Sequence, residues 1–174
     1  MAEEAAHRGL DNVVTKQGAA EALPCPPGSF DVVATRYSAH HWRDMPAGLA
    51  SMHKALKPGG LALFSDVIAP ASPLRDTWLQ SLELLRDPSH VRNASLSDWR
   101  RLLEEVGFAV AEVFNLRLRL EFASWIERMR TPPEHVAAIR ALQRCASAEV
   151  ADHFAFEPDG SFTLDTVLIV AHRE

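Results

Sequence analysis

The residues best suited to chemistry stand together at residues 36–42, which read RYSAHHW. They follow an apolar run, FDVVAT at 30–35, whose length and composition predict a buried strand. Imidazole groups can exchange protons near neutral pH. In open α/β sheets, ligands bind in the crevice outside the carboxyl ends of the strands. We therefore predict that residues 36–42 line a ligand-binding cleft.

Other chemistries find less support in the sequence. Neighbouring side chains on an extended backbone point to opposite sides, and no third residue is spaced to complete a metal site with the two histidines, so no metal is predicted. The hydrolase pattern G-x-S-x-G is absent. Cys25 and Cys145 stand alone, without metal or redox spacing. Unpaired cysteines are typical of a reducing, cytoplasmic setting.

Composition predicts one globular domain. The chain has 174 residues, of which 47% are hydrophobic and 24% charged. A net charge of -5 without a Lys/Arg block argues against a nucleic-acid partner. The apolar runs are too short to span a bilayer, and the N-terminus has no apolar segment typical of a signal peptide, so we predict no membrane association.

Local patterns predict strands that alternate with helices and therefore a parallel α/β sheet, except that the last two strands break the alternation. Pro46 suits the first turn of the helix at 47–57, Ser72 and Pro73 can open the helix at 74–87, and Ser97 is the predicted cap of the helix that Gly107 ends. The predicted strands are 13–17, 30–35, 61–67, 109–120 and 161–172. The predicted helices are 2–8, 47–57, 74–87, 98–106, 122–130 and 133–154, with a sharp turn at 57–60.

Three segments in order are more specific than any single motif: QGAAEALPCPPGSFDVVATRYSAHHW, ALKPGGLALFSDV and DWRRLLEEVGF. Together they resemble class I S-adenosylmethionine-dependent methyltransferases, in particular the methyltransferase type 11 branch and its YafE-like group. The resemblance covers essentially the whole chain. It implies a Rossmann-like sheet, S-adenosylmethionine as cofactor and methyl transfer to an unidentified small molecule.

The resemblance also assigns residues. In the family, the loop after the third strand meets the adenine, and the first residue of that loop is often an acid that binds the adenine amino group. Alanine stands at that position here and cannot accept this hydrogen bond. Leu23 and Pro24 match the apolar wall beside the adenine. The implied cofactor-binding residues are Ala19, Ala20, Glu21 and Arg36, the last beside the methionine part.

For the two histidines the resemblance favours unequal roles. His41 matches a position near the transferred methyl group, so it is the candidate catalytic base where the acceptor must lose a proton. His40 is expected to have a structural role, as loop histidines often do. We therefore expect His41→Ala to reduce turnover more than His40→Ala in a complete enzyme.

The family's principal cofactor site has no counterpart in the sequence. No two glycines are spaced G-x-G, and the glycine-rich turn and the ribose-binding acid of the family are both missing. The expected fold is therefore a partial methyltransferase domain over 1–174 that lacks its first two strands and binds S-adenosylmethionine weakly or not at all. Two causes would explain the missing segments: the start of the sequence is truncated or misassigned, or the protein is a natural gene product that has lost the activity. Two other readings stay open: a non-catalytic remnant that self-associates or binds a partner protein, and a different α/β enzyme without this cofactor.

Without those strands, residues 30–35 would form an exposed sheet edge. We expect this edge to pair with a second copy of the chain in a homodimer. Two alternatives are less favoured: the strand at 13–17 could move over to pair with the edge, or the protein could be poorly soluble.

Residues 122–158 form a helical, lid-like insertion between the last two strands. The apolar stripe Phe122, Trp125, Ile126 and Met129 is expected mainly to add core against the sheet. Arg128 and Arg130 could meet an anionic substrate group, although solvated charges are the default expectation for a helix surface.

Overall fold

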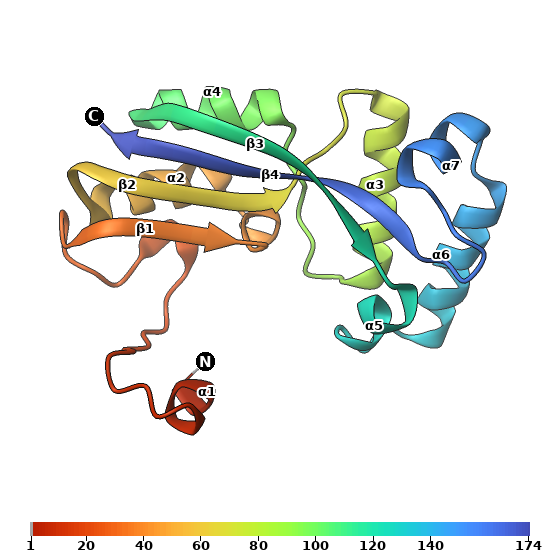
Figure 1. Ribbon diagram of the computed structural model, residues 1–174, viewed down its shortest axis with the longest axis horizontal. Coiled ribbons are helices and arrows are strands. Elements are labelled where there is room, and N and C mark those ends of the chain that lie inside the picture. Colours follow the sequence, from red (N-terminus) through yellow and green to blue (C-terminus); the bar gives the residue numbers. More distant parts are fainter. Residues whose placement is uncertain (1) are drawn as a thin grey trace.

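The computed structural model describes residues 2–174 and has one mixed sheet of four strands in the order β1-β2-β4-β3 (Figure 1). The strands are β1 (Phe30–Arg36), β2 (Leu56–Val67), β3 (Phe108–Leu120) and β4 (Phe162–Arg173). The helices are α1 (Ala2–His7), η1 (Ala20–Ala22), η2 (Ala39–His41), α2 (Met45–Ala55), α3 (Pro73–Arg86), α4 (Leu96–Val106), α5 (Phe122–Glu127), α6 (Pro133–Cys145) and α7 (Ala148–Phe154).

The strand directions agree with the predicted fold class. β1 and β2 are parallel, and β4 runs antiparallel to both β2 and β3. β3 is consequently parallel to β2, as expected, and its end at Leu120 lies on the same side as the carboxyl ends of β1 and β2. The three helices α5, α6 and α7 connect β3 to β4 and stand beside α3 at one end of the sheet (Figure 1).

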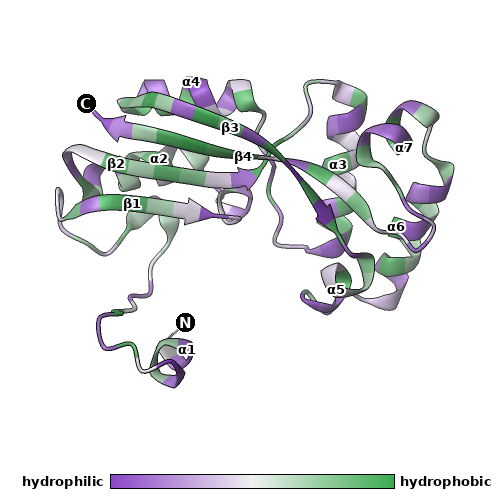
Figure 2. Ribbon diagram, in the orientation of Figure 1, coloured by the Kyte–Doolittle hydropathy of each residue, from purple (hydrophilic) through white to green (hydrophobic). Residues whose placement is uncertain are grey.

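Two buried clusters hold the molecule together. One lies under α2 and α4 and contains Leu49, Phe64 and Trp99, all at most 1% exposed. The second lies under α3 and α5–α7 and contains Leu82, Trp125 and other large apolar side chains. In Figure 2 the middle of the sheet is hydrophobic, whereas α4 and α7 carry hydrophilic stretches.

The predicted helix 133–154 is interrupted at residues 146–147, between α6 and α7. Three further local predictions were wrong. The first is the cap of α4, which is Ser95 and not Ser97. The Ser95 side chain accepts a hydrogen bond from the Asp98 amide at 3.1 Å, and Asp98 Oδ2 accepts one from the Ser95 amide at 3.3 Å. This reciprocal capping box satisfies the Ser95 and Asp98 amides at the start of the helix, where backbone amides have no partner within the helix. Gly107 ends α4 with φ of 100°, as predicted.

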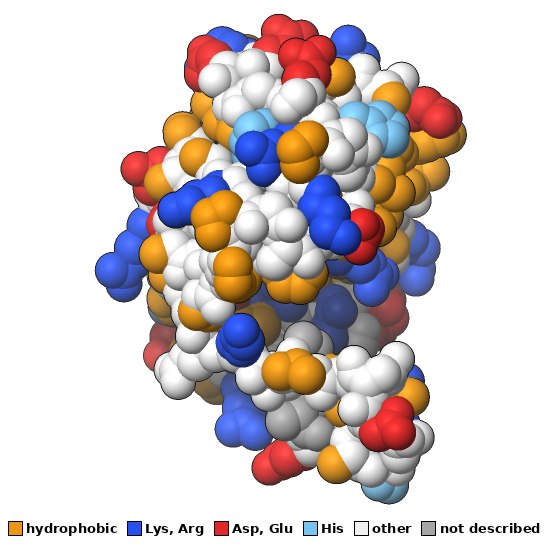
Figure 3. Space-filling model, turned by 90° about the vertical axis from the view of Figure 1, so that its left-hand side faces the viewer, with side chains coloured by type: hydrophobic (Ala, Val, Ile, Leu, Met, Phe, Trp, Pro, Cys, Tyr) orange, Lys and Arg blue, Asp and Glu red, His pale blue; other side chains and the backbone are white. Residues whose placement is uncertain are grey.

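The second error concerns residues 13–17, which form no strand. Within residues 2–174, no other segment pairs with them, and a β-prone sequence is not stable as a strand without a partner. Val14 is 81% exposed. This N-terminal part stands away from the sheet in Figure 1 and forms a lower lobe in Figure 3.

The third error concerns residues 57–60, which lie inside β2 and do not precede it. Phe30 pairs with Leu56 and Val32 with Leu61, so β2 bulges between these two pairs. Gly59 has φ of 72° in this bulge, a backbone conformation that favours glycine.

Candidate active site

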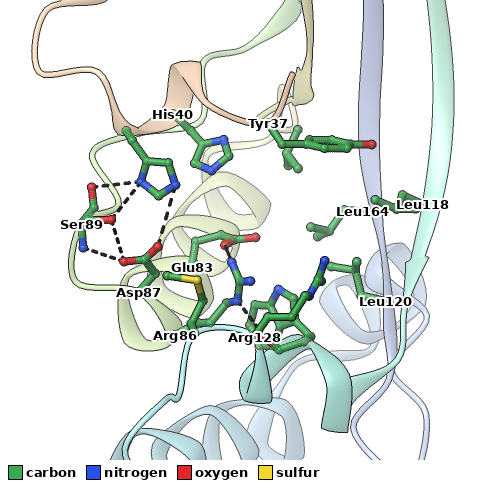
Figure 4. Close-up of a pocket in the computed structure, with 14 residues that line it drawn as sticks. Tyr37, His40, Glu83, Arg86, Asp87, Ser89, Leu118, Leu120, Arg128 and Leu164 are labelled. Atoms are coloured by element: carbon green, nitrogen blue, oxygen red, sulfur yellow. Dashed lines mark hydrogen bonds and ion pairs between the residues drawn. The ribbon is translucent and has the colours of Figure 1, made fainter. Parts of the chain in front are cut away.

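A cavity of about 440 Å³ opens at the carboxyl end of β1, between the turn η2, helix α3 and the α5 segment (Figure 4). One wall is polar and the opposite wall is apolar. Tyr37, at the start of the turn, has φ of 49°, and such strain outside glycine often marks functional sites. The lining residues are Tyr37, His40, His41, Val67, Glu83, Arg86, Asp87, Ser89, Leu118, Leu120, Trp125, Arg128, Met129 and Leu164.

His40 is held by a buried carboxylate. Its Nδ1 lies 2.6 Å from Oδ1 of Asp66, which is 1% exposed near the end of β2. Asp66 also accepts the backbone amide of Ala39 at 2.9 Å, so it fixes the turn and the ring together. Burial acts to lower the pKa of His40, but the hydrogen bond and charge of Asp66 outweigh it, and the pKa is raised.

His41 lies at the rim of the same cavity. Its Nδ1 is 3.1 Å from Ser89 Oγ and 3.2 Å from the Ser89 carbonyl oxygen, and its Nε2 is 3.8 Å from Asp87 Oδ2. Burial acts to raise the pKa of Asp87, yet hydrogen bonds from Ser89 and the charge of His41 bring the pKa below its usual value. Asp87 therefore stays ionised beside this imidazole.

Two further polar residues come from α3 and were not predicted from the sequence. Glu83 is 6% exposed, and burial raises the pKa of its carboxyl group. Arg86 lies 3.8 Å from it, donates to the Trp125 carbonyl oxygen at 3.0 Å and stacks over the Trp125 ring. The sequence held one signal: Glu83 follows Leu79 by four residues and so lies on the apolar face of α3.

The insertion contributes the apolar wall. Of its predicted stripe, Phe122 and Trp125 are buried in the second cluster, whereas Met129 is 41% exposed and lines the cavity. Arg128 also lines the cavity, and Arg130 does not. The stripe thus serves both as core and as cavity wall.

The predicted cofactor residues are distributed differently. A second cavity of about 490 Å³ runs along the exposed face of β1, and Gly18, Ala20 and Leu23 line it. Ala19, Glu21 and Arg36 are not among its lining residues. Arg36 is exposed, with its guanidinium 4.9 Å from the Tyr37 ring centroid.

Glu21 has a structural partner of its own. Its carboxylate accepts the backbone amides of Arg43 at 2.9 Å and of Asp44 at 3.3 Å. Backbone hydrogen bonds, from its own amide and from these two, lower the pKa of Glu21. This anchors η1 to the start of α2.

The second cavity fits one end of the implied cofactor. Leu23, Val33 and Ala20 offer apolar surface suited to an adenine ring. Gly18 lets Pro24 pack closely beside this cavity, because a Cβ on Gly18 would lie only 2.6 Å from Pro24 Cδ. None of the described residues that line this cavity is acidic, so they supply no carboxylate for ribose hydroxyls. The described residues therefore fit the adenine end and leave the ribose end without its usual partner.

Comparison with known proteins identifies the family of this chain. A methyltransferase domain family matches residues 1–113. The uncharacterized protein YafE of Escherichia coli K12 is 47% identical over 173 residues, which are 99% of this chain and 84% of YafE. The uncharacterized methyltransferase YcgJ of Bacillus subtilis 168 is 36% identical over 95% of this chain and 67% of its own. The crystal structure of YcgJ superposes with a TM-score of 0.92, covering 99% of this chain and 76% of that one.

The chain therefore belongs to the class I S-adenosylmethionine-dependent methyltransferases. Within residues 2–174, no helix is both long and apolar enough to traverse a bilayer. The same residues contain no group of three or more His, Cys, Asp or Glu side chains placed to hold a metal ion.

Proposed function

We propose that this protein transfers the methyl group of S-adenosylmethionine to a small molecule bound in the cavity beside His40 and His41. One observation carries the proposal: a single turn at the end of β1 separates the two cavities. Ser38 and Trp42 line the cavity that suits adenine, and Tyr37, His40 and His41 line the other. A cofactor and an acceptor would thus meet at this turn, at the strand ends where α/β folds bind ligands.

The residues of the chain would act mainly by positioning. S-adenosylmethionine, when bound, supplies an electrophilic methyl group. The apolar wall of Leu118, Leu120 and Trp125 would exclude water and orient the acceptor, and proximity of this kind accounts for much of the rate in transfers between two bound molecules. His41 would contact the acceptor at the rim, where its ring faces Asp87 and Ser89. We propose that residues 122–158 act as a lid-like unit of this domain, because Met129 and Arg128 border the cavity mouth.

Cofactor binding by the 174-residue protein tests this function. We expect S-adenosylmethionine to bind with a dissociation constant well above the micromolar range, because the ribose end lacks an acidic partner, and to support slow methyl transfer at millimolar concentration. Calorimetry and mass-spectrometric detection of methylated acceptors measure the two effects.

A matched pair of variants locates the site. Ala20→Phe fills the second cavity and should weaken cofactor binding at least tenfold, whereas Ala22→Phe, on the same short helix but outside the cavity, should not. Equal effects of the two variants would place the cofactor elsewhere. The absence of transfer at saturating cofactor, with all acceptors tried, would favour the alternative of a non-catalytic, methyltransferase-like protein.

We further propose that two copies pair through β1 in a homodimer. β1 is the first strand in the sheet order, and Phe30 and Val32 on it are 45% and 50% exposed. Both residues also line the second cavity, so pairing through this edge and cofactor binding would compete. An apolar strand edge with free backbone groups is a template for pairing with another chain. The unpaired cysteines support a reducing, cytoplasmic location for this assembly.

The edge proposal predicts that Val32→Lys shifts the protein from dimer to monomer, because a charge on the edge disfavours strand pairing. Multi-angle light scattering at several concentrations measures the shift. Val14→Lys adds the same charge on a segment outside the sheet and should leave the dimer intact. A wild-type protein that stays monomeric at high concentration would refute the pairing.

A further inference from the structure

We propose that the first cavity accepts a neutral molecule with a weakly acidic hydroxyl group, a phenol or an enol, held between Glu83 and His40, and that the His40–Asp66 pair takes its proton. This inference rests on the proposed methyl transfer and names the class of its acceptor. The O–H bond breaks, its electron pair stays on the acceptor oxygen, and the proton bonds to Nε2 of His40. The oxygen so formed is the nucleophile.

Glu83 supplies the first part of the argument. Its side chain is 8% exposed, and its carboxyl group points into the cavity (Figure 4). Within residues 2–174, no group donates a hydrogen bond to it, and its nearest charged neighbour is Arg86 at 3.8 Å. A bound hydroxyl group would supply the missing partner: its oxygen would accept a hydrogen bond from the protonated Glu83 carboxyl group while its own proton faces Nε2 of His40.

His40 supplies the second part. Asp66 holds Nδ1 at 2.6 Å, which fixes the tautomer and leaves Nε2 as the proton acceptor. Nε2 makes no hydrogen bond to any described residue, and the ring borders the cavity with its side chain 11% exposed. Asp66 would stabilise the imidazolium that forms, the role that a carboxylate has in Ser-His-Asp triads. His41 lacks this arrangement, because both of its ring nitrogens face groups of the protein itself. His40 therefore takes the role of base, the reverse of the assignment that the family resemblance favoured.

The charges around the cavity select a neutral acceptor. Carboxyl groups of Glu83 and Asp87 and guanidinium groups of Arg86 and Arg128 border the same space as His40. Glu83 is paired with Arg86, and Asp87 with His41, so these groups already have partners of opposite charge within the protein and do not need a charged acceptor. An imidazole with an ordinary pKa of about 6.5 can draw a proton from a phenol of pKa about 10, but hardly from an aliphatic alcohol. The remaining wall is apolar and suits an apolar body: Val67, Leu118, Leu120, Trp125, Met129 and Leu164.

Binding of 2-naphthol tests the acceptor class without cofactor. We expect calorimetry to show 2-naphthol binding at least tenfold more tightly than 2-methylnaphthalene, 2-naphthoate or a naphthyl ammonium compound. Glu83→Leu should remove that preference while keeping the fold, since it places an apolar side chain at a buried position. Equal affinity for the four probes, or a preference for a charged one, would overturn the acceptor class.

The proton transfer has its own readout. The absorbance of naphtholate should appear at lower pH on the protein than in water, and His40→Gln and Asp66→Asn should each abolish that displacement. His41→Gln should lower the affinity but keep the displacement. The reverse pattern would assign the proton to His41 and overturn the proposal. These measurements use no cofactor, so they are independent of methyl transfer. If the naphthol probes give the contrary result while the protein methylates other acceptors, only this inference is refuted. If the probes behave as expected but no methyl transfer is found, only the proposed function is refuted.

Discussion

Replacing Trp125 by alanine should lower the free energy of unfolding by roughly 3–5 kcal/mol, the usual cost of removing a large aromatic side chain from a core. Trp125 is 2% exposed and meets Phe162 edge to face at 4.9 Å between ring centroids. It also supports the guanidinium of Arg86, 5.1 Å from its ring. Urea denaturation followed by circular dichroism measures the loss.

A second tryptophan serves as the matched control. Trp99 is 1% exposed but belongs to the cluster under α2 and α4, and Trp99→Ala should cost a similar free energy. Only Trp125→Ala should expose residues 122–156 to limited proteolysis under native conditions, because only that cluster holds α5–α7 against the sheet. A loss below about 1 kcal/mol for Trp125→Ala would show that α5 is peripheral to the fold.

The second large effect is a loss of stability in acid caused by His90. His90 is 7% exposed on the loop after α3, and its Nε2 donates to Gln80 Oε1 at 2.8 Å. Its Nδ1 is buried without a hydrogen-bond partner among the described residues. Burial lowers the pKa of His90 to about 4, with smaller contributions from the charges of His40 and His41.

The direction of the effect follows from proton counting. Between about pH 6.5 and pH 4, a histidine in the unfolded chain is protonated, whereas His90 in the folded protein is still neutral. Stability therefore falls as the pH falls through this window, by roughly 3 kcal/mol at 1.36 kcal/mol per pH unit. His40 acts in the opposite sense: its raised pKa contributes stability at low pH that is lost as the pH rises through that pKa.

Comparison of variants isolates the contribution of His90. His90→Gln should flatten the decline between pH 6.5 and 4, because glutamine carries no titrating proton. His7→Gln, an exposed position on α1, should leave the profile of the wild type unchanged. Denaturant titrations at half-unit pH steps measure the profiles. Parallel curves for the wild type and His90→Gln would mean that His90 is solvated in the folded state.

The sequence by itself determined the fold class and which segment borders the first cavity. The apolar runs that become β1, β2 and β4 and the polar segment at 36–42 are local patterns, and local patterns can be read without knowing contacts. Local patterns also predicted that Gly107 ends α4 and that residues 122–154 are mainly helical. The family resemblance, which those segments carry, is confirmed by the relatives.

Only the tertiary structure decided which side chains meet in the cavity. His40 from η2, Glu83 from α3 and Trp125 from α5 are far apart in the sequence and come together because α3 and the insertion pack at the carboxyl end of the sheet. Whether residues 13–17 form a strand also depended on a partner elsewhere in the chain, since strand pairing is a long-range contact. The unequal partners of His40 and His41, two adjacent residues of the same type, came from Asp66 and Asp87 on two other segments, a difference that no local pattern encodes.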